Sequence, residues 1–216
     1  IHLTASGGPF RTWSREDIAK ATRAQALNHP NWSMGSKITI DSATMMNKGL
    51  ELIEAAWLFD MPPEKIDIVV HRESIIHSLV EYDDNAVLAQ LGTPDMRVPI
   101  QYALTYPDRL PCPAKQLRLE DWKNLSFYAP DDEAFPAMNL ARRALTMGGL
   151  YPAALNAANE VAVGAFIAGE IGFTDITRLA AQALEQNLST PVSVEDVFAA
   201  DEMVRRQTRE TIETMK

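Results

Sequence analysis

The sequence has a single cysteine and no long apolar run, and each shortage excludes a class of protein. Cys112 is the only cysteine among 216 residues, so no internal disulfide and no cysteine-based metal cluster can form. We therefore expect a reducing, cytoplasmic setting. No apolar run approaches the roughly 20 residues that a membrane-spanning helix needs. No basic start followed by an apolar core marks a secretory signal.

Basic residues are fewer than acidic ones, with 20 Lys and Arg against 29 Asp and Glu and a formal net charge of -9. Nucleic acids and anionic membranes bind to basic surfaces, so we expect neither as a partner. The excess of acidic residues is unevenly distributed along the chain. Residues 1–60 carry 6 basic and 6 acidic side chains, whereas residues 131–216 carry 7 basic and 13 acidic ones. The first sixty residues therefore oppose an anionic ligand least.

The usual nucleotide-binding and hydrolase loops are missing as well. The chain contains no G-x-G-x-x-G, no G-x-x-x-x-G-K-[ST] and no G-x-S-x-G. It opens with the apolar residues IHLT, without an initiator Met, as if a strand were already in progress. We expect the sequence to be the later part of a longer polypeptide.

The composition, 46% hydrophobic and 23% charged, is that of an ordinary globular protein. Periodicity and turn residues predict strands at the start of the chain and at residues 37–40, 66–70, 75–80 and 86–91, the last two forming a hairpin. They predict helices at residues 22–25, 43–59, 96–105, 135–147, 151–168, 174–186 and 194–215, with Ser193 as an N-cap.

The order of these elements predicts an α+β fold followed by helices. We expect an α/β domain with a mixed sheet and a hairpin over residues 1–105, truncated at its start. A proline-rich linker with little regular structure should cover residues 106–131. A small four-helix bundle should cover residues 132–216, since four helices with short joins commonly pack in this way.

Residues 29–37 (HPNWSMGSK) have neither a helical nor a strand period, and they combine a His, a Trp and a Lys. Loops of this composition are often binding loops on a rigid scaffold. The alternative is an ordinary surface loop in which Trp32 packs back on the core. Composition alone slightly favours this alternative.

Residues 41–51 (DSATMMNKGLE) form the junction between the predicted strand and the predicted helix. If Ser42 begins the helix, its hydroxyl and the free backbone N–H groups face one point, where a phosphate could dock. Asn47, Lys48 and Glu51 share one face by their spacing of three and four residues. The alternative is a capped helix with a surface Lys-Glu pair, which spacing alone favours. Gly49 favours the functional interpretation, because a glycine within a helix suggests that another group approaches the helix backbone closely.

Other candidates are weaker. Gly7 and Gly8 with Ser6 could offer backbone N–H groups to an anion. His71 and His77 lie six apart, which is not a common metal-ligand spacing, so we expect structural roles. The polar residues of 156–160 lie within an apolar helix and should satisfy one another across the bundle.

Five runs, taken in order, are more specific than any one of these features. The chain resembles the 1-deoxy-D-xylulose 5-phosphate reductoisomerase family over essentially its whole length. The matching runs are residues 3–11 (LTASGGPFR), 29–35 (HPNWSMG), 41–51, 90–97 (QLGTPDMR) and 154–160 (ALNAANE). Residues 71–74 (HRES) depart from the HPQS more usual in the family, and they lie off its pocket.

The resemblance implies roles for single residues. The family's phosphate pocket corresponds to Ser6, His29, Ser42, Asn47 and Lys48. Trp32 and Met34 correspond to a flexible lid over substrate and nicotinamide, and Gly35 to a cofactor contact. Glu51 corresponds to one of three carboxylates that hold Mg²⁺ or Mn²⁺, and the other two precede Ile1. Glu51, His29 and Lys48 are thus the implied catalytic residues, and Trp32 and Glu51 also face the substrate.

The implied reaction is the metal-dependent rearrangement of 1-deoxy-D-xylulose 5-phosphate and its reduction by NADPH to 2-C-methyl-D-erythritol 4-phosphate, a step of non-mevalonate isoprenoid biosynthesis. The family's N-terminal NADPH-binding domain is absent from this sequence, so the chain alone is expected to be inactive. Family members are typically homodimers. The alternative is a non-catalytic phosphosugar-binding or dimerisation fragment.

Overall fold

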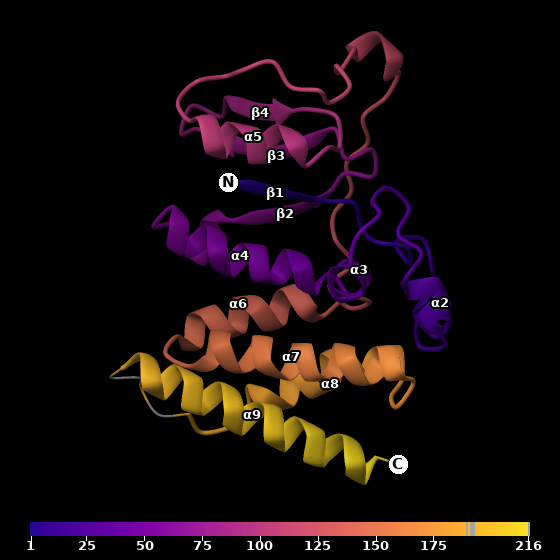
Figure 1. Cartoon of the computed structure of the whole chain (residues 1–216), viewed down its shortest axis with the longest axis vertical. Helices are drawn as coiled ribbons and strands as arrows, with labels where there is room; N and C mark the ends of the chain where they lie inside the picture. Colours follow the sequence, from indigo (N-terminus) through magenta and orange to yellow (C-terminus); the bar gives the residue numbers. More distant parts are fainter. Residues whose placement is uncertain (189, 191–192, 216) are drawn as a thin grey trace. The chain divides into compact units, whose positions relative to one another are not determined.

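The computed structural model describes residues 1–188, 190 and 193–215 (Figure 1). By packing, the chain forms two compact units. Residues 1–6 and 67–129 make the first, here called the sheet unit. Residues 7–66 and 130–216 make the second, here called the helical unit.

The sheet unit contains a four-stranded mixed sheet, as the sequence predicted. Its strands are β1 (His2–Ala5), β2 (Asp67–Val70), β3 (Ile76–Glu81) and β4 (Val87–Leu91), in the spatial order β2-β1-β3-β4. β1 pairs with β2 in parallel, whereas the β1–β3 and β3–β4 pairs are antiparallel. Helix α5 (Arg97–Thr105) follows β4.

The predicted hairpin is confirmed between β3 and β4. Tyr82 N–H donates to the carbonyl of Ala86 at 2.9 Å and closes the turn. Asn85 has a φ of 67°, a left-handed conformation that asparagine tolerates better than most residues. Along the sheet, Ile68 and Val70 of β2 are buried, which accounts for the apolar composition of that strand.

Residues 106–129 complete the sheet unit with little regular structure. The segment holds one short 3-10 helix, η2 (Leu119–Asp121), and one bridge between Tyr128 and Val70. The buried His71 fastens it: its Nδ1 lies 2.9 Å from the carbonyl oxygen of Ser126, and its ring stacks on Phe127 at 4.9 Å. His71 therefore has the structural role that its spacing predicted.

The helical unit holds the remaining helices. They are α1 (Arg15–Ile18), α2 (Arg23–Ala26), α3 (Ser36–Ala43), α4 (Met46–Leu58), η1 (Pro63–Lys65), α6 (Ala137–Met147), α7 (Tyr151–Ala168), α8 (Phe173–Ala183) and α9 (Val194–Thr214). Thr22 and Ser193 each close a capping box at a helix start, and Gly169 ends α7 in the left-handed region. These predicted boundaries are confirmed.

The core of the helical unit joins α4 to the C-terminal helices (Figure 1). Met46 is fully buried in one cluster with small and apolar side chains of α6, α7 and α8, and Leu50 and Ile53 pack against it. The predicted apolar stripe of α4 therefore faces α6, but Trp57 at its end is 76% exposed.

Residues 37–40 are not a strand, contrary to the sequence prediction, and belong to helix α3. Thr39 and Ile40 are buried there, and burial against neighbouring helices outweighs the weak β preference of these residue types. The chain then passes through Met45, whose φ is 62°, and α4 starts at Met46 instead of residue 43.

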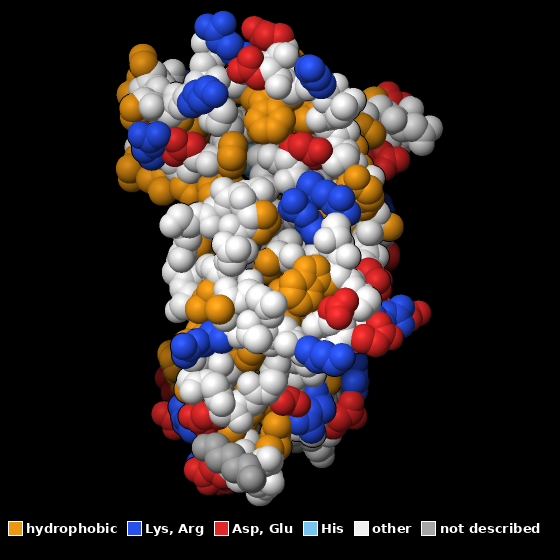
Figure 2. Space-filling model, turned by 90° about the vertical axis from the view of Figure 1, so that its right-hand side faces the viewer, with side chains coloured by type: hydrophobic (Ala, Val, Ile, Leu, Met, Phe, Trp, Pro, Cys, Tyr) orange, Lys and Arg blue, Asp and Glu red, His pale blue; other side chains and the backbone are white. Residues whose placement is uncertain are grey.

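The compact units cut the chain differently from the predicted domains, because residues 7–66 pack with residues 130–216. The domain boundaries at residues 105 and 131 stay a prediction. Among the described residues, no helix is both long and apolar enough to cross a membrane. On the face drawn in Figure 2, basic and acidic side chains are interspersed and do not gather by sign.

Candidate functional site

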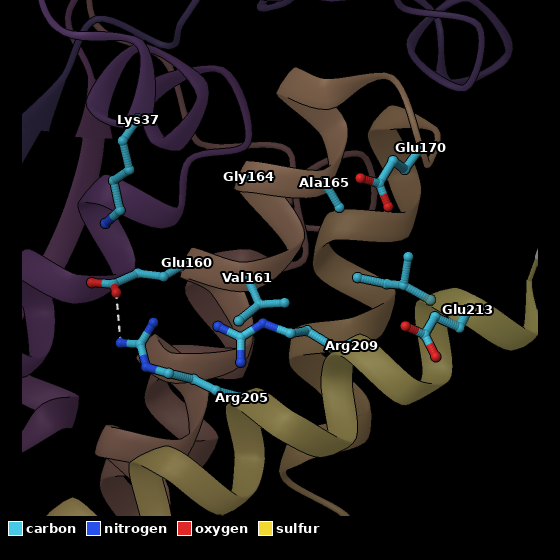
Figure 3. Close-up of a pocket in the computed structure, with 10 residues that line it drawn as sticks. Lys37, Glu160, Val161, Gly164, Ala165, Glu170, Arg205, Arg209 and Glu213 are labelled. Carbon is cyan, nitrogen blue, oxygen red and sulfur yellow. Dashed lines mark hydrogen bonds and ion pairs between the residues drawn. The ribbon is translucent and has the colours of Figure 1, made fainter.

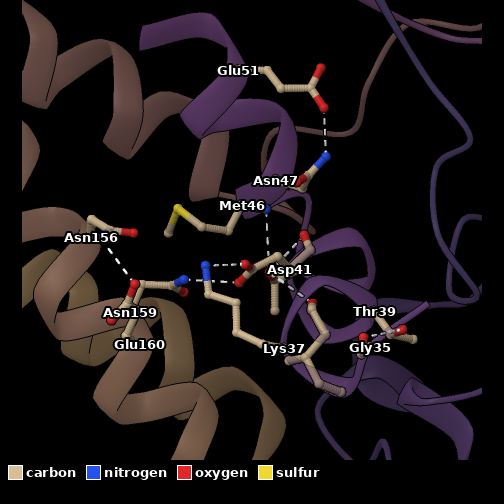
Figure 4. A network of polar contacts seen from close by, with 12 residues as sticks. Gly35, Lys37, Thr39, Asp41, Met46, Asn47, Glu51, Asn156, Asn159 and Glu160 are labelled. Atoms are coloured by element: carbon tan, nitrogen blue, oxygen red, sulfur yellow. Dashed lines mark hydrogen bonds and ion pairs between the residues drawn. The ribbon is translucent and has the colours of Figure 1, made fainter. Parts of the chain in front are cut away.

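Three predicted site residues meet on the first two turns of α4. Asn47 Nδ2 donates to Oε1 of Glu51 at 2.6 Å (Figure 4). The Lys48 ammonium pairs with Oε2 of the same carboxylate. The side chain of Lys48 is only 12% exposed. The pair between Lys48 and Glu51 is therefore less exposed than the solvated surface pair that the alternative interpretation expects. We call Asn47, Lys48 and Glu51 the α4 cluster.

The sharp corner between α3 and α4 places this cluster at a helix N-terminus. Met45 takes the left-handed conformation, and the Met46 N–H donates to Oγ1 of Thr44 at 3.3 Å. The positive end of the α4 macrodipole and two side-chain donors, the Asn47 amide and the Lys48 ammonium, thus occupy one helix end. Such an end favours an anion.

Ser42 lies elsewhere than predicted. It is the penultimate residue of α3, at the negative end of that helix's dipole, so the expected Ser42 N-cap of an anion-binding helix is wrong. The reason is the helical state of residues 37–40, which moves the helix start from Ser42 to Met46. Ser42 nevertheless precedes the corner that leads into the α4 cluster.

The structure explains one of the two glycines near the start of the chain, Gly8. Its φ is 67°, and a Cβ built there would lie 2.6 Å from the carbonyl oxygen of Ser42. The glycine is therefore required for close packing against the end of α3. Ser6, which the resemblance also assigns to the pocket, ends the first segment of the sheet unit and is half-buried.

His29 begins the loop between α2 and α3 and holds it by its ring. Its Nδ1 accepts hydrogen bonds from the backbone N–H groups of Asn31 and Trp32, at 3.1 and 3.0 Å. The ring proton of the neutral imidazole is therefore on Nε2. Burial first, and the charge of Arg11 second, lower the pKa of His29 below its ordinary value. A neutral His29 is thus a donor through Nε2.

The other loop residues differ in exposure. Trp32 and Met34 are half-buried, and Gly35 is exposed and starts α3 as its N-cap. A Cβ on Gly35 would meet nothing within 4 Å. Within the helical unit alone, neither the φ of −61° nor steric crowding requires a glycine here.

Gly49 has a structural explanation. A Cβ at this position would lie 2.9 Å from Cβ of Ala141 and 3.1 Å from the carbonyl oxygen of Ala137, both on α6. The close approach that the glycine suggested is therefore that of a neighbouring helix and not of a ligand. This packing fixes α4 at the level of its cluster.

A second polar network, which sequence reasoning missed, holds α3 against α7. The carboxylate of Asp41 is 2% exposed, its Oδ2 lies 2.6 Å from the Lys37 ammonium, and its Oδ1 accepts from Asn159 Nδ2 at 2.9 Å (Figure 4). Oδ1 of Asn159 is buried and has no protein partner, which costs about 1–3 kcal/mol. We call Lys37, Asp41 and Asn159 the α3–α7 network.

Local sequence gave little signal for this network, because Asp41 and Asn159 are 118 residues apart. Only the polar residues within the apolar α7 pointed to it. They were expected to satisfy one another across the bundle. The structure confirms this in part, since Glu160 accepts from Asn156 at 3.2 Å and from Arg205 at 2.6 Å.

Within the described part of the chain, the carboxylates do not form a complete metal site. Among the residues that the structure describes, no three His, Cys, Asp or Glu side chains gather as metal ligands would. Glu51 can supply one carboxylate oxygen, and Asn47 and Lys48 already hold its two oxygens. Mg²⁺ and Mn²⁺ need several oxygen ligands, so Glu51 by itself does not make a site for either ion.

Comparison with known proteins gives one consistent family. The model of the DXP reductoisomerase C-terminal domain matches residues 91–207, and that of the 1-deoxy-D-xylulose 5-phosphate reductoisomerase C-terminal domain matches residues 1–59. A 1-deoxy-D-xylulose 5-phosphate reductoisomerase of Citrifermentans bemidjiense is 56% identical over 217 residues, which cover 98% of this chain. One of Zymomonas mobilis is 52% identical over 216 residues and covers the whole chain.

Solved structures agree with the sequences. The reductoisomerase from Zymomonas mobilis in complex with NADPH superposes with a TM-score of 0.91 at 50% identity, over 98% of this chain and 55% of that one. A DOX-P reductoisomerase in complex with NADPH, fosmidomycin and magnesium superposes with a TM-score of 0.93 at 45% identity, over 99% of this chain and 55% of that one.

The chain spans about 55% of the length of the relatives it matches. The mixed sheet followed by C-terminal helices agrees with their structures, which confirms the predicted fold class. Both family models and the sequence relatives give the same assignment, so this chain belongs to the 1-deoxy-D-xylulose 5-phosphate reductoisomerase family.

Proposed function

We propose that this chain is the substrate-binding part of an enzyme that rearranges 1-deoxy-D-xylulose 5-phosphate and reduces it with NADPH to 2-C-methyl-D-erythritol 4-phosphate, in non-mevalonate isoprenoid biosynthesis. The observation that carries the proposal is the α4 cluster, a buried ammonium, an amide and a carboxylate at one helix N-terminus. The family assignment supplies the substrate and the reaction.

The phosphate of the substrate binds at the α4 cluster. Lys48 provides a charge-assisted hydrogen bond and Asn47 a neutral one, and the N-terminus of α4 adds its dipole. Ser42 and the Nε2–H of His29 extend the pocket within the helical unit. Anchoring the dianion at one end fixes the position of the reacting carbons, which converts binding energy into orientation.

The loop with Trp32 and Met34 closes over the sugar and the nicotinamide, and Gly35 contacts NADPH. Closure excludes water from the aldehyde intermediate. Support for this role comes from His29, whose ring holds the backbone of the loop at Asn31 and Trp32. The pyrophosphate of NADPH binds elsewhere in the complete enzyme, because this chain has no glycine-rich nucleotide loop.

Glu51 is one of the ligands of the divalent metal, Mg²⁺ or Mn²⁺. The relative that binds fosmidomycin also holds NADPH and magnesium, which supports the need for all three sites in one enzyme. Since this chain offers one carboxylate of the set, we expect no turnover from residues 1–216 by themselves.

The experiment compares two proteins with 1-deoxy-D-xylulose 5-phosphate, NADPH and Mg²⁺. One is the chain alone, and the other is a chimera in which residues 1–216 replace the equivalent part of the Zymomonas mobilis relative, 52% identical to it. NADPH oxidation is expected only from the chimera, and Glu51→Gln should abolish it.

An inactive chimera that folds and binds NADPH would overturn the proposed activity. It would favour the alternative, a phosphosugar-binding or dimerisation fragment. Turnover by the chain alone would contradict the assignment of the metal and nucleotide sites to the rest of the enzyme.

We also propose a homodimer, with β4 at the interface. This strand is the edge of the sheet, and Val87 and Leu88 on it are exposed, as is Val80 on β3. Pairing of β4 with its copy is self-complementary and removes an unprotected edge. The single cysteine, Cys112, suits a cytoplasmic enzyme.

A further inference from the structure

The carboxylate of Asp41 links a distant helix to the segment that carries the α4 cluster. It is almost fully buried and lies on the last turn of α3, five residues before the start of α4 (Figure 4). Both of its oxygens are held, Oδ2 by Lys37 at 2.6 Å and Oδ1 by Asn159 at 2.9 Å. The orientation of the last turn of α3 is thus fixed from α7.

A second carboxylate, Glu160, lies near Lys37 but takes its hydrogen bonds from other residues. Glu160 lines a cleft of about 840 Å³ together with Lys37 and Arg205 (Figure 3). Its hydrogen bonds come from Arg205 and Asn156. Lys37 makes its ion pair with Asp41. Asn159 aims its amide N–H at the same carboxylate although this leaves its own oxygen without a protein partner.

The corner after Asp41 transmits this orientation to the cluster. Thr44 and Met45 connect the two helices without an intervening loop, and the left-handed Met45 allows a single path into α4. Further along α4, Gly49 packs on α6. Together with the buried Met46, the packing of Gly49 on α6 and the contact of Asp41 with α7 hold Asn47 and Lys48 in position.

We propose that Asn159 and Lys37 are positioning residues for phosphate binding, acting through the buried carboxylate of Asp41. The inference rests on the proposed function, because it takes the α4 cluster as the phosphate site. Neither residue contacts the cluster in the structure, so their loss should affect the geometry of binding and leave the chemistry of the donors intact.

The first test is kinetic, in the chimera. Asn159→Leu should raise KM for 1-deoxy-D-xylulose 5-phosphate by about tenfold, the effect of one buried hydrogen bond to a charge, with KM for NADPH within about twofold of the parent. Asn156→Leu is the matched control on the same helix and should change neither constant.

The second test needs no activity. In the 216-residue chain, Asn159→Leu should speed amide hydrogen exchange at residues 44–49 by about tenfold, whereas Asn156→Leu should not. Asn159→Ala, which adds no bulk, serves if the leucine variant fails to fold. Unchanged exchange at residues 44–49 would overturn the inference. So would equal KM values for the Asn159 and Asn156 variants in an active chimera. An inactive parent chimera would instead count against the proposed function, and the exchange measurement would still decide the inference.

Discussion

At the scale of single residues, Lys48 contributes most of the charge that can bind a phosphate at the α4 cluster. Its ammonium is largely shielded from water, so a hydrogen bond to a dianion there is stronger than one at the surface. We expect Lys48→Met in the chimera to raise KM for the phosphosugar about tenfold to a hundredfold, the range for a lost hydrogen bond to a charge. Steady-state kinetics measure this directly.

A surface lysine provides the control for that experiment. Lys20 is exposed, and Lys20→Met removes the same charge from the same compact unit. Its KM should equal that of the parent. Equal KM values for the Lys48 and Lys20 variants would remove Lys48 from the phosphate site.

The imidazole of His29 should have a lower pKa than that of an ordinary histidine. Burial, followed by the charge of Arg11, lowers its pKa from 6.5. The unfolded chain therefore takes up this proton first as the pH falls. The stability contributed by neutral His29 is complete above about pH 6.5 and is lost as the pH falls through the folded pKa.

NMR titration of the ring in the 216-residue chain gives both the pKa and the tautomer. We expect the Nε2–H tautomer at neutral pH, and Arg11→Met should raise the pKa only in part, since burial is the larger cause. A pKa at or above 6.5 in the parent chain would show that the His29 ring is not held as described.

The sequence predicts the part of the site whose residues lie close together along the chain. Asn47, Lys48 and Glu51 stand at helical spacings of three and four, so periodicity brings them together whatever else the chain does. Ser42 was misplaced because its position depends on where a helix starts. Asp41 gained its role from Asn159, which no local pattern connects to it.

At the scale of helices, Gly49 tests how closely α4 and α6 pack. Alanine is the better helix former by about 1 kcal/mol, but its Cβ would lie 2.9 Å from that of Ala141 and 3.1 Å from a backbone oxygen. Overpacking costs about 1–3 kcal/mol. We therefore expect Gly49→Ala to lower the free energy of unfolding by up to about 2 kcal/mol in urea titration.

Gly164 is the matched control, because it also lies inside a helix, α7, but a Cβ there meets nothing within 4 Å. Gly164→Ala should raise the free energy of unfolding by up to about 1 kcal/mol. If both substitutions stabilise the chain, the α4–α6 approach is looser than the structure has it.

Elements were predictable where several local signals agreed. The boundaries of α2, α7 and α9 follow from capping boxes and a C-terminal glycine, and the β3–β4 hairpin from two apolar runs around a turn. Helix α3 was not predictable, because residues 37–40 read as a β-branched run. Its helical state depends on Thr39 and Ile40 being buried by neighbouring helices.

At the scale of the whole molecule, the packing of residues 7–66 with residues 130–216 has no signature in the sequence. The polar and apolar contacts that join them, such as Met46 in the cluster with Leu155 or Asp41 with Asn159, connect residues more than a hundred positions apart. Sequence patterns place elements along the chain and do not state which elements pack together.

The β4 edge gives the prediction at this scale. Leu88 is 63% exposed on an edge strand and pairs across the hairpin with the exposed Val80. A charge on such an edge opposes strand-to-strand association between copies. Leu88→Lys should therefore shift the chain from dimer to monomer in sedimentation equilibrium.

Leu58→Lys makes the same exchange at a residue that is 76% exposed on the last turn of α4, in the helical unit. It should leave the dimer intact, because it lies off the sheet edge. Loss of the dimer in both variants would point to a general effect of added charge. Persistence of the dimer in Leu88→Lys would place the interface on another surface. If the two variants differ in this way, the dimer that we propose forms through β4, and pairing of that strand with its copy would cover both its exposed backbone edge and its apolar side chains.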